Sequence, residues 1–132
     1  MAAWLPRLLL ALFAVINLGR GAVHAFAADG GAHSIAGLDL SGDALTIISL
    51  FASIGLMQAS LGRFELWAVL RRPELVLPLL ALQTLQTGLG VIHLWLYRPL
   101  PVVVPGAGFN LALLGLLAIG WGLILTRKGR NP

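Results

Sequence analysis

The sequence predicts an all-α protein, a single-domain integral membrane four-helix bundle over residues 1–132. Of its 132 residues, 58% are hydrophobic and only 11% are charged, whereas a soluble domain carries about 25% charged residues. The mean hydropathy is +0.91, and the apolar residues gather in four runs near the ~20 residues that a helix needs to cross the hydrocarbon core. This composition excludes a soluble globular enzyme and a disordered chain.

The four predicted spans cover residues 8–28, 44–70, 75–97 and 107–126. Helices are expected because backbone groups in a bilayer must pair within their own segment. Breakers separate the runs: Gly30-Gly31 in the first loop, Arg71-Arg72-Pro73 in the second and a proline-rich stretch in the third. The longest loop, residues 29–43, has 15 residues, so no soluble domain fits between the spans.

The first span has an alternative reading as a signal peptide. Arg7, an apolar core over residues 8–18 and Ala25-Phe26-Ala27 provide a basic start and a cleavage site, and cleavage after Ala27 would leave three spans. We expect the segment to be retained, because residues 19–27 are long for a cleavage region. A retained helix must continue through Arg20 to cross the bilayer.

The remaining spans differ in length and in their ends. The second, at 27 residues, is longer than a bilayer needs, so we expect it to tilt or to emerge as a surface helix near Arg63. In the third, Pro78 falls in the first turn, where a missing N–H costs little. The fourth is apolar from Ala107 onward and ends before the basic tail.

Lys and Arg residues predict the orientation, because they favour the cytoplasmic side. Only Arg20 and Arg98 fall on one side of the predicted spans. The other side carries Arg7, Arg63, Arg71, Arg72, Arg127, Lys128 and Arg130. Both termini should therefore be cytoplasmic, with a bacterial inner membrane as the expected location. This topology explains the net charge of +4 without a nucleic-acid partner.

Polar residues within the spans follow helical spacing, which predicts that they face the bundle interior. Asn17, Arg20 and His24 are spaced by three and four in the first span. Similar stripes of polar or small residues occur in the third span (Gln83, Gln86, Gly90, His93, Tyr97), the second (Ser49, Ala52, Ser53, Ala59, Ser60, Arg63) and the fourth (Asn110, Gly115, Ala118, Gly122). The simplest role of such stripes is packing between membrane helices.

Two histidines and one arginine suggest a ligand site in the outer half of the bundle. His24 and His93 each lie about 6 Å below the outer end of a span, so they could ligate a haem iron or a metal; the alternative is a hydrogen-bonded or interfacial histidine. Arg20 could bind an anion or a lipid headgroup, or extend to the interface. The candidate pocket residues are Asn17, Arg20, His24, Gln86, His93 and Asn110.

Catalytic chemistry has no visible basis in the sequence, so we expect a protein that is not an enzyme and has no catalytic residue. The absence of Cys excludes disulfides, thiolate metal sites and thiol catalysis. Of five acids, three lie in the first loop, and Glu65 and Glu74 are expected near the inner surface. A proton-coupled transporter normally needs a carboxylate inside the membrane, which argues against the small multidrug exporters.

From residue 49 to residue 126 the chain resembles, in layout, a bacterial four-helix membrane family of unknown function related to DoxX-like proteins. The shared features are a Gly- and Leu-rich second span ending in Leu70-Arg71-Arg72-Pro73, a third span, a proline-rich outer loop and an apolar fourth span. The resemblance implies a four-helix membrane fold and no defined activity.

The sequence leaves three functional hypotheses. The first is a non-enzymatic scaffold or accessory subunit; the second is a ligand- or haem-binding membrane protein; the third is an oligomeric transporter or channel. The bilayer is the expected partner, together with a homo-oligomer or a larger membrane complex, because Gly55-xxx-Ala59 and Ala118-xxx-Gly122 offer close-packing faces. An open polar cavity near His24 and His93 would favour ligand binding, and tight packing there would favour a scaffold.

Overall fold

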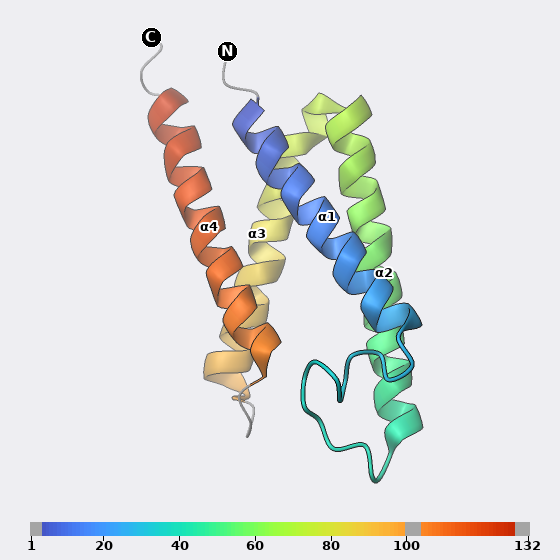
Figure 1. The fold of residues 1–132 in the computed structure, drawn as a ribbon. Coiled ribbons are helices and arrows are strands. Elements are labelled where there is room, and N and C mark those ends of the chain that lie inside the picture. Colours follow the sequence, from blue (N-terminus) through green and yellow to red (C-terminus); the bar gives the residue numbers. More distant parts are fainter. Residues whose placement is uncertain (1–3, 100–103, 129–132) are drawn as a thin grey trace.

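The computed structural model describes residues 4–99 and 104–128, and this part of the chain contains helices and no strand. Helices α1 (Trp4–Phe26), α2 (Ala44–Arg71), α3 (Val76–Ile92) and α4 (Pro105–Lys128) alternate in direction, so the chain goes up and down through the bundle (Figure 1). A short 3₁₀ turn, η1 (Pro73–Leu75), precedes α3, and a π-helical turn, η2 (His93–Tyr97), follows it. All four candidate spans are long and apolar enough to cross a membrane, which confirms the all-α class and the four predicted runs.

The helix ends agree with the predicted spans to within a few residues. Helix α1 begins four residues before the predicted start and continues through Arg20, as retention of the first span requires. Helix α2 is unbroken over 28 residues, so no separate surface helix forms near Arg63. It ends at Arg71, and Pro73, which has no N–H, opens the 3₁₀ turn that leads into α3.

The α1–α2 loop is held by the side chain of Asp29. Its carboxylate accepts hydrogen bonds from the backbone N–H groups of Gly31 (2.8 Å) and Ser34 (2.6 Å) and from the Ser34 hydroxyl (3.1 Å). These bonds lower the pKa of Asp29 to about 2. Gly30 and Gly31 have positive φ values of 62° and 76°, which glycine adopts without strain. The loop therefore folds back as an ordered segment at one end of the bundle.

Helices α1 and α2 pack with their backbones in contact because glycines lie between them. A Cβ atom at Gly21 would lie 2.6 Å from the backbone N of Ala59, and one at Gly55 would lie 2.6 Å from that of Ala25. A Cβ atom at Gly62 would lie 2.7 Å from the carbonyl oxygen of Ala14 on α1. The Gly55-xxx-Ala59 face, expected to serve oligomerisation, is therefore occupied by α1 within the chain.

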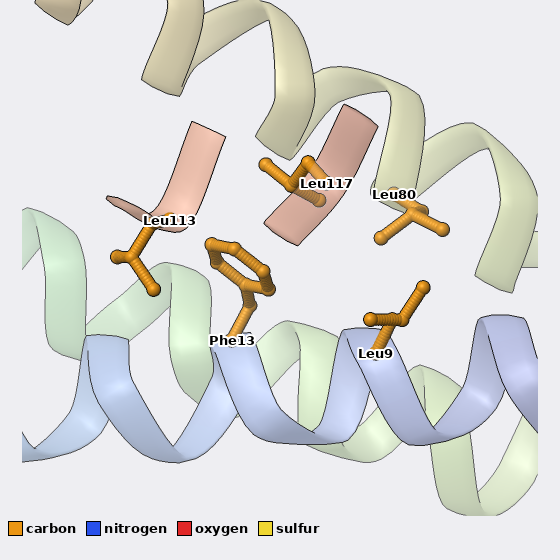
Figure 2. Close-up of a cluster of buried hydrophobic side chains, with 5 residues drawn as sticks. All are labelled: Leu9, Phe13, Leu80, Leu113 and Leu117. Carbon is orange, nitrogen blue, oxygen red and sulfur yellow. The ribbon is translucent and has the colours of Figure 1, made fainter. Parts of the chain in front are cut away.

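The hydrophobic core lies toward the end of the bundle where both termini are found. One cluster joins α1, α3 and α4 through Leu9, Phe13, Leu80, Leu113 and Leu117, and Figure 2 shows these side chains converging between the three helices. A second cluster joins α1 to α2 and α3 through Leu10, Ala68, Val76 and Leu79. We call this the terminal end of the bundle, and the opposite end, which carries the loop of residues 27–43, the loop end.

Candidate functional site

Polar side chains from three helices meet in the middle of the bundle. The Asn17 amide of α1 donates one hydrogen bond to Glu65 Oε2 on α2 (2.8 Å) and another to Gln83 Oε1 on α3 (3.0 Å). Gln83 in turn donates to the Thr87 hydroxyl (2.9 Å). Asn17, Glu65 and Gln83 are all buried, with 7%, 0% and 6% of their surface exposed. We refer to Asn17, Glu65, Gln83 and Thr87 as the polar network.

The position of Glu65 corrects the expectation that no carboxylate lies within the bundle. Glu65 is six residues from the end of α2 at Arg71, which places it about 9 Å inside the helix. The close approach of α1 and α2 at Gly62 brings it opposite Asn17. Its second oxygen, Oε1, is buried without a hydrogen-bond partner among the described residues. The sequence argument against proton coupling therefore no longer applies.

A cavity of about 750 Å³ opens at the loop end, between α1, α2, the α1–α2 loop and the start of α4. This volume falls within the range of about 300–1,000 Å³ that is typical of small-molecule sites. Most of the wall is apolar, with Val23, Ile35, Phe51, Ile54 and Phe109 among its residues. Four polar side chains also line it: Arg20, His24, Gln58 and Asn110.

Arg20 is the charged residue of this wall, and its hydrogen-bond acceptor is the neutral side chain of Asn110. Its Nη1 donates to Asn110 Oδ1 at 2.7 Å, which joins α1 to α4. The guanidinium also lies over the Phe109 ring, 5.8 Å from its centroid. No acidic residue is among the described residues that line the cavity. A guanidinium has five N–H donors in a planar fork, so Arg20 retains donors for an anionic group in the cavity.

A smaller cavity of about 230 Å³ lies between the large cavity and the polar network. Arg20, Gln58 and Asn110 line both cavities, so the two spaces adjoin. Asn17, Gln83 and Thr87 of the polar network also line the smaller one. Polar side chains therefore continue from the Arg20 wall of the large cavity to the hydrogen-bond partners of Glu65.

The two histidines do not share a pocket. His24 lines the large cavity and is half-buried; its Nδ1 donates to the carbonyl oxygen of Gly30 (2.7 Å), and Phe51 contacts its ring edge to face. His93 is exposed, lies against the Tyr97 ring and lines neither cavity. The described residues also contain no group of three His, Cys, Asp or Glu suited to a metal. The expected inward orientation of His93 is wrong, and the residues do not fit a bis-histidine haem.

Helix rotation explains which predicted stripes face outward. On α3 the buried or half-buried side follows Val76, Leu80, Gln83 and Thr87, then Gly90. Because one residue corresponds to about 100° of rotation, Gln86 and His93 fall beside this line; both are exposed, although Gln86 touches the smaller cavity. The stripe positions Ser49, Ser53, Ser60 and Arg63 of α2 and Gly115, Ala118 and Gly122 of α4 are likewise exposed, against expectation. Ala52 and Ala59 of the α2 stripe are half-buried, as expected.

Two polar residues of α2 that were not predicted belong to the site. Gln58 lines both cavities, and Glu65 anchors the polar network. Their spacing contained the signal: Gly55, Gln58, Gly62 and Glu65 are separated by three, four and three residues, which places them on one helix face. The arginines nearby in the sequence instead favour a surface position for Glu65.

Comparison with protein-family models, with curated proteins and with solved structures found no match to this chain. The resemblance to DoxX-like proteins therefore stays a prediction, and the functional argument depends on the cavities and the polar network.

Proposed function

We propose that this protein is a membrane-embedded binding protein for an amphipathic molecule with an anionic head group. The observation that supports the proposal is Arg20, a cation on the wall of a 750 Å³ cavity that is otherwise mostly apolar and has no acidic lining residue among those described. A cation partly removed from water is costly unless it is paired. An anion in the cavity would provide that pair.

The two parts of the ligand follow from the two kinds of wall. Apolar residues from α2, the loop and α4 would contact a hydrocarbon body. The Arg20 guanidinium would bind a carboxylate, phosphate or sulfonate through paired N–H donors, which is the geometry in which Arg binds such groups best. Asn110 and His24 provide further polar contacts beside it.

The arrangement of the helices favours a ligand that arrives from the bilayer. Helices α2 and α4 lie on opposite sides of α1 (Figure 1), and the cavity lies between them at the loop end. A molecule already dissolved in the membrane would enter between α2 and α4 without crossing the core. Both an anionic phospholipid and a free amphipathic acid have the required chemistry.

A scaffold role is the second candidate, and the surface of α4 favours it. Gly108, Gly115 and Gly122 are spaced by seven residues, and a Cβ atom at any of them would meet nothing within 4 Å. A helix of a partner or of a second copy would pack closely on such a face. Alanine-to-tryptophan replacement at Ala118 would disrupt an oligomer that uses this face, and size-exclusion chromatography in detergent would detect the change.

We also propose that the protein is a multi-pass protein of a bacterial inner membrane, with both termini in the cytoplasm and the loop end outside. The bias of Lys and Arg supports this orientation. Because the natural chain has no Cys, Ser41→Cys in the loop and Glu74→Cys in the α2–α3 turn are clean reporters. A membrane-impermeant maleimide should label Ser41→Cys in intact cells and Glu74→Cys only after permeabilisation; the reverse pattern would contradict the orientation.

Binding is tested with decyl sulfonate, a single-chain anion, on the protein in nanodiscs of zwitterionic lipid by isothermal titration calorimetry. A hydrogen bond to a charged group contributes about 1.5–3 kcal/mol, so Arg20→Gln should weaken binding about 10- to 100-fold. Arg98→Gln is the matched control, because Arg98 is exposed and belongs to the same loop end. Decanol, which has no anion, should bind both variants and the wild type equally weakly.

Two results would reject the proposal: equal affinity of the wild type and Arg20→Gln for decyl sulfonate, or no binding above that of empty nanodiscs. A second arm distinguishes the ligand sources. If the natural ligand is an anionic phospholipid, nanodiscs containing phosphatidylglycerol should compete with decyl sulfonate. If it is a free acid, phosphatidylglycerol should leave the affinity unchanged.

A further inference from the structure

Glu65 is the buried acid that the proposed binding site does not use. Its side chain is fully buried between α1, α2 and α3, at the level of Asn17 and Gln83. One carboxyl oxygen accepts from Asn17, and the other has no partner among the described residues. A charged carboxylate in such surroundings is unfavourable without a cation. As arranged here, the group is therefore expected to carry a proton on its unpaired oxygen.

Among the described arginines of the helices packed around Glu65, Arg20 is the one that is not exposed; Arg7 on α1 is exposed. Helix α3 has no titratable side chain between Val76 and Ile92, and α4 has none from Pro105 to Thr126. On α2 the neighbouring cations, Arg63 and Arg71, are exposed. On α1, Arg20 lies one turn beyond Asn17, about 4.5 Å along the helix, and both residues line the smaller cavity.

We propose that Glu65 is a proton-exchanging group, and that its carboxylate, once the proton leaves, competes with the anion of the loop-end cavity for the Arg20 guanidinium. The second half of this inference rests on the proposed function. The competition follows from charge: among the described residues, Arg20 donates its side-chain hydrogen bond to the neutral Asn110, and either anion would be a better acceptor. Gln58 lines both cavities and lies on the same face of α2; its buried Oε1 has no hydrogen-bond partner within the described part of the chain.

Charge balance gives the consequence. With Glu65 protonated, Arg20 is available, and the bound anion neutralises it. With Glu65 ionised, Arg20 and Glu65 neutralise each other, and the cavity loses its cation. Anion binding is therefore linked to proton uptake at Glu65. Such linkage is the requirement for carrying an anion and a proton together across a membrane, which connects the site to the transporter hypothesis.

The proton site is tested first without any ligand. Dicyclohexylcarbodiimide reacts with protonated carboxyl groups in apolar surroundings, and mass spectrometry locates the adduct. We expect labelling of Glu65 at acidic pH that declines at alkaline pH, and none in Glu65→Gln. The matched control is Glu74→Gln, which should keep the labelling, because Glu74 is exposed and pairs with Arg72 (3.5 Å). Glu65→Gln retains an oxygen acceptor for Asn17, and a thermal unfolding scan checks that it folds.

The competition is tested by the pH dependence of decyl sulfonate affinity, since the sulfonate stays charged throughout. In the wild type the affinity should fall by tenfold or more from acidic to alkaline pH, and in Glu65→Gln it should stay constant. His24→Gln should keep the fall, because His24 borders the cavity but does not contact the polar network. The inference is overturned if Glu65 is never labelled, or if Glu65→Gln retains the pH dependence.

The two failures are distinguishable. Decyl sulfonate binding that depends on Arg20 but shows no effect of Glu65 would refute the inference and leave the proposed function intact. Labelling of Glu65 without any decyl sulfonate binding would refute the proposed function and the competition, while Glu65 itself would stand as a proton-exchanging group.

Discussion

Replacing Gly21 with alanine adds one methyl group where α1 and α2 are closest. The new Cβ would lie 2.6 Å from the backbone N of Ala59, 2.7 Å from the carbonyl oxygen of Gly55 and 2.9 Å from the Cβ of Ala59. Favourable contacts between heavy atoms require about 3.5–4.0 Å. Two of the three atoms belong to the backbone of α2 and cannot rotate away, so the helices must separate by about 1 Å to admit the methyl group.

The expected cost combines two opposing effects. Overpacking of a tight interface costs about 1–3 kcal/mol. Alanine is favoured over glycine within a helix by about 0.5–1 kcal/mol. The free energy of unfolding should therefore fall by about 0.5–2 kcal/mol. Steric trapping in bicelles measures this free energy for helical membrane proteins, and the circular dichroism spectrum verifies that the helices persist.

Gly19→Ala is the matched control, two residues away on the same helix. A Cβ atom at Gly19 would meet nothing within 4 Å, so this variant should be as stable as the wild type or slightly more so. Gly55→Ala should behave like Gly21→Ala, and the double variant should cost less than the sum, because one separation of the helices accommodates both methyl groups. Equal stabilities of Gly21→Ala and Gly19→Ala would refute the close contact of α1 and α2.

Three further predictions concern the polar network, the loop and the first helix. Asn17→Leu removes the side chain that donates hydrogen bonds to both Glu65 and Gln83, so it should lower the free energy of unfolding by about 1–3 kcal/mol. Ser49→Leu, on an exposed face, should change this free energy little. Equal effects of the two variants would contradict the polar network. The pKa of Asp29 is lowered to about 2 by the backbone N–H groups of Ser34 and Gly31, so its stabilisation of the loop is complete above pH 3.8 and is lost as the pH falls toward 2. The protection factors of these N–H groups against hydrogen exchange should fall over that interval in the wild type and be low at every pH in Asp29→Asn. Because α1 provides Leu10, Phe13 and Asn17 to the interior, residues 1–27 should remain attached, and the intact mass of the purified protein would reveal their removal.

The spans were predictable because each depends on an average over some twenty residues. An apolar run between glycines, prolines and charges defines a helix whether or not any one residue is placed correctly, so all four helices occur near their predicted positions. The prediction that Asn17 and Gln83 face inward is also confirmed, because both side chains are buried. Both residues lie near the middle of their helices, so their place within the span does not depend on which residue ends the helix.

The site itself depends on contacts between helices, which no single span reveals. His24 and His93 have the same predicted depth, yet His24 lines the large cavity and His93 does not, because depth does not determine rotation about the helix axis. The neighbouring arginines predict a surface position for Glu65. The close approach of α1 to α2 at Gly62 is what buries it. Gly55 and Gly62 are separated by seven residues on α2, and this repeat was the best available indication that a second helix covers the face shared by Gln58 and Glu65.

Helix α1 packs more closely against α2 than against α4, so the two interfaces should respond differently to a ligand. Between α1 and α2 the contact is backbone to backbone at Gly21, Gly55 and Gly62, so displacing one helix against the other must open a close-packed interface. Between α1 and α4 at the loop end, the structure instead uses the long side chain of Arg20, with one hydrogen bond to Asn110. That bond exchanges at little cost for a bond to an anion, since both partners accept from the same guanidinium. Ligand-dependent movement is therefore expected in α4, whereas α1 and α2 keep Glu65 and Arg20 in a constant relation to each other.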